Sequence, residues 1–282
     1  MTTELSQAIQ PKSAYAAVAL SELNFQLPPF PSVASKLVVK LTEQDVDTRS
    51  IIELIECEPT VFSKVLNLAN SPMYATSRVI TTVGHAVVLL GLNSVSQLAL
   101  AVATGAIFQD DGPTRDLRAE TYSQSLAIAT VARVIARQSR KVNPDEAFLC
   151  GVAHDVGKLV LLDKAGDAYV DLLKKTSASK TPLAEQQAFG ATHPDLGNCC
   201  AKSWGLPHSI NEAIQNHHQP LDSVDDPLSQ VIIEANELAR RWQLGFESSD
   251  DVDAIDIDER LDSETKAVCE EQFAAIRDTC LS

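Results

Sequence analysis

Apolar residues recur every three to four positions through most of this 282-residue chain, and that spacing is the period of an α-helix rather than of a β-strand. The first clear example is a predicted helix that follows a Pro-rich turn at 27–31. Its apolar face consists of Val33, Leu37, Val38 and Leu41. No pair of segments alternates apolar and polar residues as half-buried strands do. We therefore expect an all-α fold.

Residues 45–72 predict two further helices. Asp47 or Thr48 is placed to cap the first, and Pro59 is placed in the first turn of the second, where a missing N–H removes no helical hydrogen bond. Turn-forming residues at 70–72 would end the second helix. The side chains expected to be buried are Ile51, Ile52, Leu54 and Ile55 in the first helix and Val61, Phe62, Val65, Leu66 and Leu68 in the second.

Residues 81–108 predict a helix that ends at Gly91, a short turn, and a second helix capped by Asn93 or Ser94. Two apolar helices joined by a tight turn also fit a helix-turn-helix motif. A helix that reads DNA is usually accompanied by basic residues that contact the phosphates, and the second helix has none. We therefore favour two packed structural helices.

The polar segment QDDGPTRD at 109–116 interrupts the helical pattern and marks a boundary between two halves. We expect four parts, which are an N-terminal tail at 1–14, a helical subdomain at 15–112, a second helical subdomain at 113–246 and an acidic helical segment at 247–282. Within the second subdomain the pattern predicts helices over 119–139, 144–162, 166–176, 182–189, 193–205, 207–218 and 226–242.

The formal net charge of −15 argues against nucleic acid as a partner, because a phosphate backbone needs clustered Lys and Arg. Residues 247–282 hold twelve acidic and three basic residues; we interpret them as a solvated surface around a final helix, with an acidic docking arm as the alternative. No signal peptide and no bilayer-spanning stretch is present. The six cysteines form no CxxC pair, so we expect reduced thiols in a cytoplasmic protein.

The segment GVAHDVGKLVLL at 151–162 carries the clearest candidate chemistry, because His154 and Asp155 stand together among apolar residues. His193 begins a predicted helix, and His217 and His218 end another. Imidazoles with one carboxylate suit Zn, Fe, Mn or Ni, and such sites can activate water for phosphoester hydrolysis. Consecutive residues on a helix point about 100° apart, so spacing alone favours scattered histidines over a metal site.

Lys158 is open to two interpretations. It is placed either to hold a phosphate near a metal or to extend from the edge of the core with its ammonium group in solvent. We expect His85, on the outer side of its helix, and His208, in a turn, to lie on the surface.

The sequence motifs, taken in order, resemble those of HDOD domains, which are bacterial all-helical modules related to the HD-domain metal-dependent phosphohydrolases. The likeness runs from about 23 to 242 and rests on LPPFPSVASKLVVKL, IIELIECEPTVFSKVLNLANSPMYA, ITTVGHAVVLLGLNSVSQLAL, FLCGVAHDVGKLVLL and HPDLGNCCAKSWGLPHSINEAIQNHHQP. The resemblance implies an N-terminal helical subdomain packed on an HD-like helical bundle.

The resemblance also implies a set of metal ligands. His154 and Asp155 match the central His-Asp pair of HD enzymes, and His193, His217 and His218 match downstream histidines of the HD-GYP phosphodiesterases, although no GYP triplet is present. Two ligand places carry amides instead, Gln124 for a histidine and Asn236 for an aspartate. Because an amide is a neutral and poor ligand, these departures weaken metal binding.

We favour a regulatory function over catalysis. In this interpretation the chain is an HDOD-type signalling module with a degenerate metal site, and it acts by binding a protein partner or a small molecule such as a nucleotide. The remaining ligands would still suit one divalent Fe, Mn, Zn or Ni ion. The alternative is a metal-dependent phosphohydrolase acting on a nucleotide or cyclic dinucleotide, with Lys158 at the phosphate. A third possibility is a structural adaptor without a ligand site.

Overall fold

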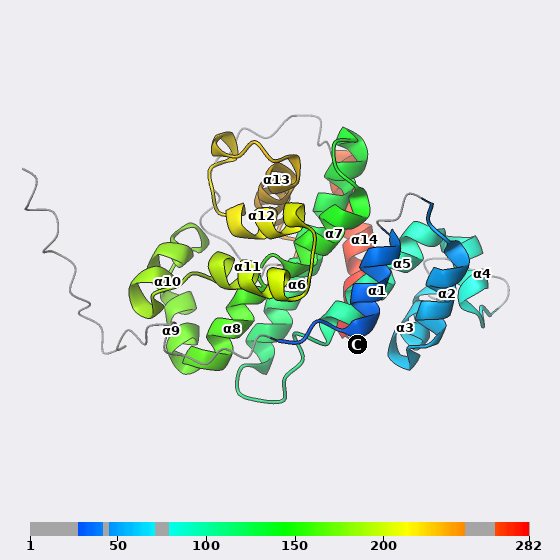
Figure 1. Cartoon of the computed structure of the whole chain (residues 1–282), viewed down its shortest axis with the longest axis horizontal. Coiled ribbons are helices and arrows are strands. Elements are labelled where there is room, and N and C mark those ends of the chain that lie inside the picture. The colour runs from blue at the N-terminus through cyan, green and yellow to red at the C-terminus, as the bar shows by residue number, and fades with distance from the viewer. Residues whose placement is uncertain (1–27, 42–44, 71–78, 246–262, 282) are drawn as a thin grey trace, which may run out of the picture.

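The computed structural model describes residues 28–41, 45–70, 79–245 and 263–281, and within these ranges it contains helices and no strand (Figure 1). The predicted all-α fold is confirmed. The tail at 1–14, Leu27 and the acidic stretch at 247–262 lie outside the described residues, as do Ser71 and Pro72, which were expected to end a helix.

The described residues of the N-terminal part form five helices, which are α1 (Ser32–Leu41), α2 (Thr48–Glu56), α3 (Pro59–Ala69), α4 (Val83–Leu90) and α5 (Leu92–Gly105). The predicted starts of α2 and α3 are confirmed, since Asp47 accepts a hydrogen bond from the Arg49 backbone N–H and Pro59 opens α3. The predicted buried faces hold in part. Four of their residues are only partly buried, namely Ile52, Leu54, Phe62 and Leu66, and the first three of these pack against the core.

Helix α5 begins two or three residues earlier than the sequence predicted, because its N-cap is Gly91 rather than Asn93 or Ser94. Gly91 stands at its N-terminal boundary with a φ of 82°, a backbone conformation that favours glycine, so neither Asn93 nor Ser94 caps the helix. All residues of α5 from Val95 to Gly105 are buried, and α5 packs against α1, α3, α4 and α7. A helix enclosed in this way offers no free face to a DNA groove, which removes the helix-turn-helix interpretation of this pair.

The long helix α6 (Arg115–Ser139) is the central element of the second half. It packs closely on α7 (Pro144–Ala153), where a Cβ on Gly151 would lie 2.4 Å from the Cα of Ala129. The expectation of one continuous helix over 144–162 is wrong. The chain breaks at His154 and Asp155 and continues as α8 (Val156–Ala165), and this break is what places the two polar side chains.

The remaining elements of this half are α9 (Asp167–Lys175), η3 (Ala178–Lys180), α10 (Thr181–Phe189), α11 (His193–Ser203), α12 (His208–Asn216), η4 (Leu221–Ser223) and α13 (Pro227–Arg241). Helix α11 lies between α8 and α12, and α13 packs on α6 and α12. The ends of α7, α11 and α12 therefore meet in the interior, and the candidate polar residues lie at those ends.

The last helix, α14 (Ser263–Leu281), returns to the N-terminal part and packs against α3, α5 and α6. Its buried side chains include Cys269, Phe273 and Ile276. Lys64 of α3 donates from Nζ to the carbonyl oxygens of Thr279 and Cys280, at 2.7 and 3.0 Å, and so pairs with carbonyls of the last turn of the helix. None of the described helices is both long and apolar enough to cross a membrane.

Candidate metal centre

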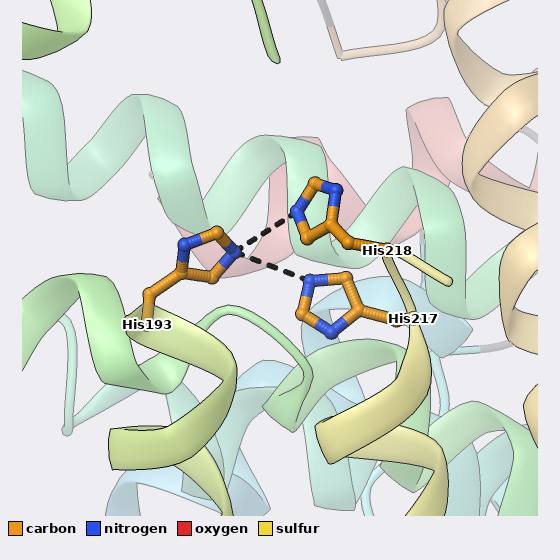
Figure 2. A group of neighbouring side chains, drawn as sticks. All are labelled: His193, His217 and His218. Carbon is orange, nitrogen blue, oxygen red and sulfur yellow. Dashed lines mark hydrogen bonds between the residues drawn. The ribbon is translucent and has the colours of Figure 1, made fainter. Parts of the chain in front are cut away.

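Five predicted site residues come together from three places in the chain and form one cluster, in which all but His218 are buried. His154 and Asp155 occupy the break between α7 and α8, His193 is the first residue of α11, and His217 and His218 follow the last turn of α12. Figure 2 shows the rings of His193, His217 and His218 turned toward one another. The objection that neighbouring residues diverge on a helix does not hold here, because His154 and Asp155 are not inside one.

The ligand atoms of the cluster are close together. His193 Nε2 lies 3.2 Å from His217 Nε2 and 3.0 Å from His218 Nε2. Asp155 Oδ1 lies 3.3 Å from His193 Nε2 and 3.6 Å from His217 Nε2, and Asp155 Oδ2 lies 3.3 Å from His154 Nε2. One carboxylate therefore connects all the buried imidazoles.

The rings of His154 and His217 are oriented by hydrogen bonds on their outer nitrogens. His154 Nδ1 donates to the carbonyl oxygen of Gly151 and His217 Nδ1 donates to the carbonyl oxygen of Ile214, both at 2.7 Å. Because a carbonyl only accepts, each Nδ1 carries the hydrogen, and in the neutral ring Nε2 is left with a lone pair that faces the cluster. This is the usual arrangement of a histidine that ligates a metal.

His193 is oriented by a carboxylate rather than by a carbonyl. Glu185 of α10 is fully buried, and its Oε2 lies 2.7 Å from His193 Nδ1 and also accepts the backbone N–H of His193 at 2.7 Å. The Tyr169 hydroxyl donates to Glu185 Oε1 at 2.6 Å. Sequence reasoning missed both residues. The only signal was a glutamate eight positions before His193, on a predicted helix that shows no other acidic residue.

Burial and neighbouring charges set the ionisation of the cluster. Burial lowers the pKa of His217 to about 4 and that of His218 well below its ordinary value. For Asp155, burial acts to raise the pKa, but the charges of His154 and Lys158 outweigh it and hold the pKa well below its ordinary range. The lowered pKa values favour neutral imidazoles at His217 and His218 beside an ionised Asp155, and these are the protonation states that bind a divalent cation.

Two glycines allow the helices to approach closely enough for the cluster to form. A Cβ on Gly157 would lie 1.9 Å from the carbonyl oxygen of His193, so α8 touches the backbone of α11. A Cβ on Gly197 would lie 2.9 Å from Cγ2 of Ile214, so α11 also packs tightly on α12.

The donor atoms fit a transition-metal ion. Two ligand atoms that each lie about 2.1 Å from a metal are about 3.0 Å apart around an octahedral ion and about 3.4 Å apart around a tetrahedral one. Two groups of possible ligands overlap at His217, one formed with His193 and His218 and the other with His154 and Asp155. Asp155 Oδ1 is buried and accepts no hydrogen bond, so a cation there would satisfy an otherwise unpaired atom. Four imidazoles and one carboxylate suit Zn, Fe, Ni or Mn.

Lys158 lies at the edge of the cluster, and its Nζ contacts Asp155 Oδ2 at 2.6 Å. Its side chain is 15% exposed. The ammonium group is thus ion-paired with a candidate ligand rather than extended into solvent. His218 is also partly exposed, so Lys158 and His218 are the more accessible residues at this site.

The two amide positions differ from each other. Gln124 on α6 is partly buried and donates from Nε2 to Glu120 of the same helix at 3.0 Å. Asn236 on α13 is buried, and its Oδ1 has no hydrogen-bond partner. His85 and His208 are exposed, as predicted.

Comparison with known proteins identifies the family of this chain. Residues 27–220 match the sequence model of the HDOD domain. This chain belongs to the HDOD family. The comparison with curated proteins finds no match.

Solved structures share the HDOD fold. An HDOD domain protein with unknown function from Geobacter sulfurreducens is 25% identical, covers 88% of this chain and 84% of its own, and has a TM-score of 0.65. A candidate phosphohydrolase from Shewanella amazonensis SB2B is 21% identical over 90% and 95% of the two chains, with a TM-score of 0.70. A candidate signal transduction protein from Marinobacter aquaeolei VT8 is 20% identical over 91% and 60%, with a TM-score of 0.72.

Proposed function

We propose that this chain is a regulatory HDOD module that binds one divalent transition-metal ion and acts through a protein partner or a small ligand such as a nucleotide. The metal ligands are His154, Asp155, His193, His217 and His218. The observation that carries the proposal is the facing set of Nε2 atoms around Asp155 Oδ1, which has no hydrogen-bond donor of its own. The proposal keeps the division at 113 between an N-terminal helical subdomain and an HD-like bundle.

Burial favours a regulatory role over turnover. His154, Asp155, His193 and His217 are each no more than 4% exposed. A hydrolytic metal site needs an open coordination position for water and room for its substrate, whereas a metal that serves structure is enclosed by protein ligands. The amides Gln124 and Asn236 also favour a regulatory role, because each stands at a position where the related enzymes carry a stronger metal ligand.

Metal analysis of protein purified without chelator tests the proposal. We expect about one equivalent of Fe, Mn, Zn or Ni, lost in His154→Ala and retained in His85→Ala, whose side chain is exposed. Protein that is metal-free after growth and reconstitution with each of the four ions would refute it. A pull-down with the metal-loaded and the chelated protein as paired baits then tests whether partner binding depends on the metal.

A second candidate function, phosphoester hydrolysis, is favoured by one observation. Lys158 and His218 are the partly exposed members of the cluster, so a phosphate would meet a cation at its accessible edge. Assays of phosphodiesters, nucleotides and cyclic dinucleotides with added Mn or Fe test this function. Activity that is abolished in Lys158→Met, with metal content unchanged, would establish it in place of the regulatory proposal.

The amides provide a further test of the regulatory proposal. Gln124→His and Asn236→Asp together restore the residue types that the resemblance implies for an enzyme. We expect the double variant to bind metal more tightly than the wild type, because a carboxylate and an imidazole are better ligands than amides. Unchanged metal affinity and stoichiometry would mean that these positions do not reach the metal.

A further inference from the structure

Helices α9 and α10, with η3 between them, form a helical hairpin over 167–189 that lies at one edge of the molecule (Figure 1). The hairpin has a small interior. Tyr169 is the fully buried residue of α9, and α10 contributes Thr181, Glu185 and Phe189. The rings of Tyr169 and Phe189 meet edge to face, with centroids 6.0 Å apart. The interior therefore contains two polar groups that are hydrogen-bonded to each other, the phenol of Tyr169 and the carboxylate of Glu185.

These two polar groups connect the hairpin to the metal cluster. Tyr169 donates to one oxygen of Glu185, and the other oxygen accepts both the backbone N–H and Nδ1–H of His193. The side chains of Glu185 and His193 are fully buried, so water does not replace either partner. We call the sequence Tyr169–Glu185–His193 the hairpin relay.

The hairpin relay determines which nitrogen of His193 faces the cluster. A neutral imidazole has a single N–H, and Glu185 holds it on Nδ1. Nε2 is then free to donate its lone pair at the point where it approaches His217 and His218 within 3.2 and 3.0 Å. If Glu185 were absent, His193 could place its hydrogen on Nε2, and that nitrogen could not bind a metal.

We infer that Glu185 is a positioning residue for the metal and that the hairpin relay couples metal occupancy to the stability of the α9–α10 hairpin. This inference rests on the proposed metal site. A metal on Nε2 favours the orientation of His193 that Glu185 holds, so it also favours the ordered hairpin. By linkage, the ordered hairpin raises metal affinity by the same factor. Metal loading at a buried site thereby changes the surface formed by α9 and α10.

Hydrogen exchange of the full chain, chelated and then titrated with Co²⁺, tests the coupling. In the wild type we expect Co²⁺ to slow amide exchange over 167–189. In Glu185→Ala, Co²⁺ should bind about 10- to 100-fold more weakly, and residual binding should no longer protect the hairpin. Glu185→Gln keeps an oxygen that can accept Nδ1–H without the charge, so its Co²⁺ affinity should lie between those of the wild type and Glu185→Ala.

Asp195→Asn supplies the matched control. Asp195 accepts hydrogen bonds from Thr192 at the same end of α11 and from Gln215 of α12, and no hydrogen bond joins it to Nδ1 of His193. The Asp195→Asn substitution weakens the start of α11 without changing the tautomer of His193, so the Co²⁺ affinity should stay near that of the wild type. Equal losses in Asp195→Asn and Glu185→Ala would show that Glu185 acts only through helix stability and would overturn the positioning role.

The outcomes separate the inference from the proposed function. Failure of the wild type to bind Co²⁺ overturns both. Co²⁺ binding that leaves exchange over 167–189 unchanged overturns the coupling alone. Nitrogen-15 NMR of the metal-free protein checks the relay directly, with His193 expected as the Nδ1–H tautomer in the wild type and as a mixture in Glu185→Ala.

Discussion

The carbonyl oxygen of His193 occupies the space that a side chain at Gly157 would need, 1.9 Å from the position of its Cβ. The backbone of α11 thus lies directly against α8. On α8 the contact is at Gly157, two residues after Asp155, and on α11 it is at His193, a candidate ligand. The same contact that joins the helices brings Asp155 Oδ1 within 3.3 Å of His193 Nε2. The packing of α8 on α11 therefore also positions two of the candidate ligands, Asp155 and His193.

Gly157→Ala is expected to destabilise the protein and to disrupt the site, because the new methyl group meets rigid backbone rather than a movable side chain. We expect a loss of about 1–3 kcal/mol or more in the free energy of unfolding, measured by urea denaturation. Gly84→Ala is the control, since a Cβ there meets nothing within 4 Å. In a helix that change should be neutral or stabilising by about 0.5–1 kcal/mol. Equal effects of the two variants would contradict the close contact.

Bound metal is expected to raise the thermal stability of the protein. At a concentration 100 times the dissociation constant, a ligand specific for the folded state adds about 2.7 kcal/mol, which corresponds to roughly 5–10 °C in a chain of this size. His218→Ala should abolish the shift produced by Co²⁺ or Zn²⁺, and His208→Ala, at an exposed position, should retain it. A shift of equal size in both variants would place the metal elsewhere.

Stability of the metal-free protein is expected to fall in mild acid. Burial holds the pKa of His217 at about 4, below its ordinary value of 6.5, so between these values the unfolded chain binds a proton that the folded chain does not. Above pH 6.5 the protonation of His217 does not reduce the free energy of unfolding. As the pH falls from 6.5 toward 4, that free energy decreases by up to about 3 kcal/mol. Urea unfolding with chelator at pH 7.5, 6.0 and 5.0 measures it. His217→Gln should flatten the pH dependence and His208→Gln should not; parallel curves for all three proteins would refute the prediction.

The last helix is expected to be an integral part of the fold. Phe273 is 4% exposed and packs in the core between α14 and the rest of the molecule. Phe273→Ala should reduce the free energy of unfolding by about 3–5 kcal/mol, as measured by chemical denaturation. Val268→Ala, on the same helix but 39% exposed, should change it by about 0.5 kcal/mol or less. A small effect at both positions would mean that α14 is only loosely attached.

The sequence predicted the helices well where local signals determine them. Asp47, Pro59 and Gly91 mark helix boundaries by their own backbone chemistry, and the structure has boundaries there. The break at His154 and Asp155 could not be predicted in this way. No glycine or proline stands at the break, and the apolar pattern continues across it. Asp155 contacts His193, which belongs to another helix and comes near the break only when the chain folds.

The candidate site was predictable in its ligands but not in its support. Residue type and the resemblance to HDOD domains singled out His154, Asp155, His193, His217 and His218, although their spacing alone favoured scattered histidines. Glu185, in contrast, looks like an ordinary glutamate on a polar helix of low amphipathicity. Its burial results from the packing of Tyr169 on one side and His193 on the other, and these partners lie on different helices.

The position of His193 has a consequence for how such a site persists over evolution. Its side chain is a candidate ligand, its backbone N–H is held by Glu185, and its carbonyl oxygen fills the gap left by Gly157. A lineage that no longer used the metal would still lose folding efficiency if this region were altered. Purifying selection on stability alone would therefore preserve much of the ligand geometry. A descendant could then regain metal chemistry by changing only a few residues around the preserved ligands.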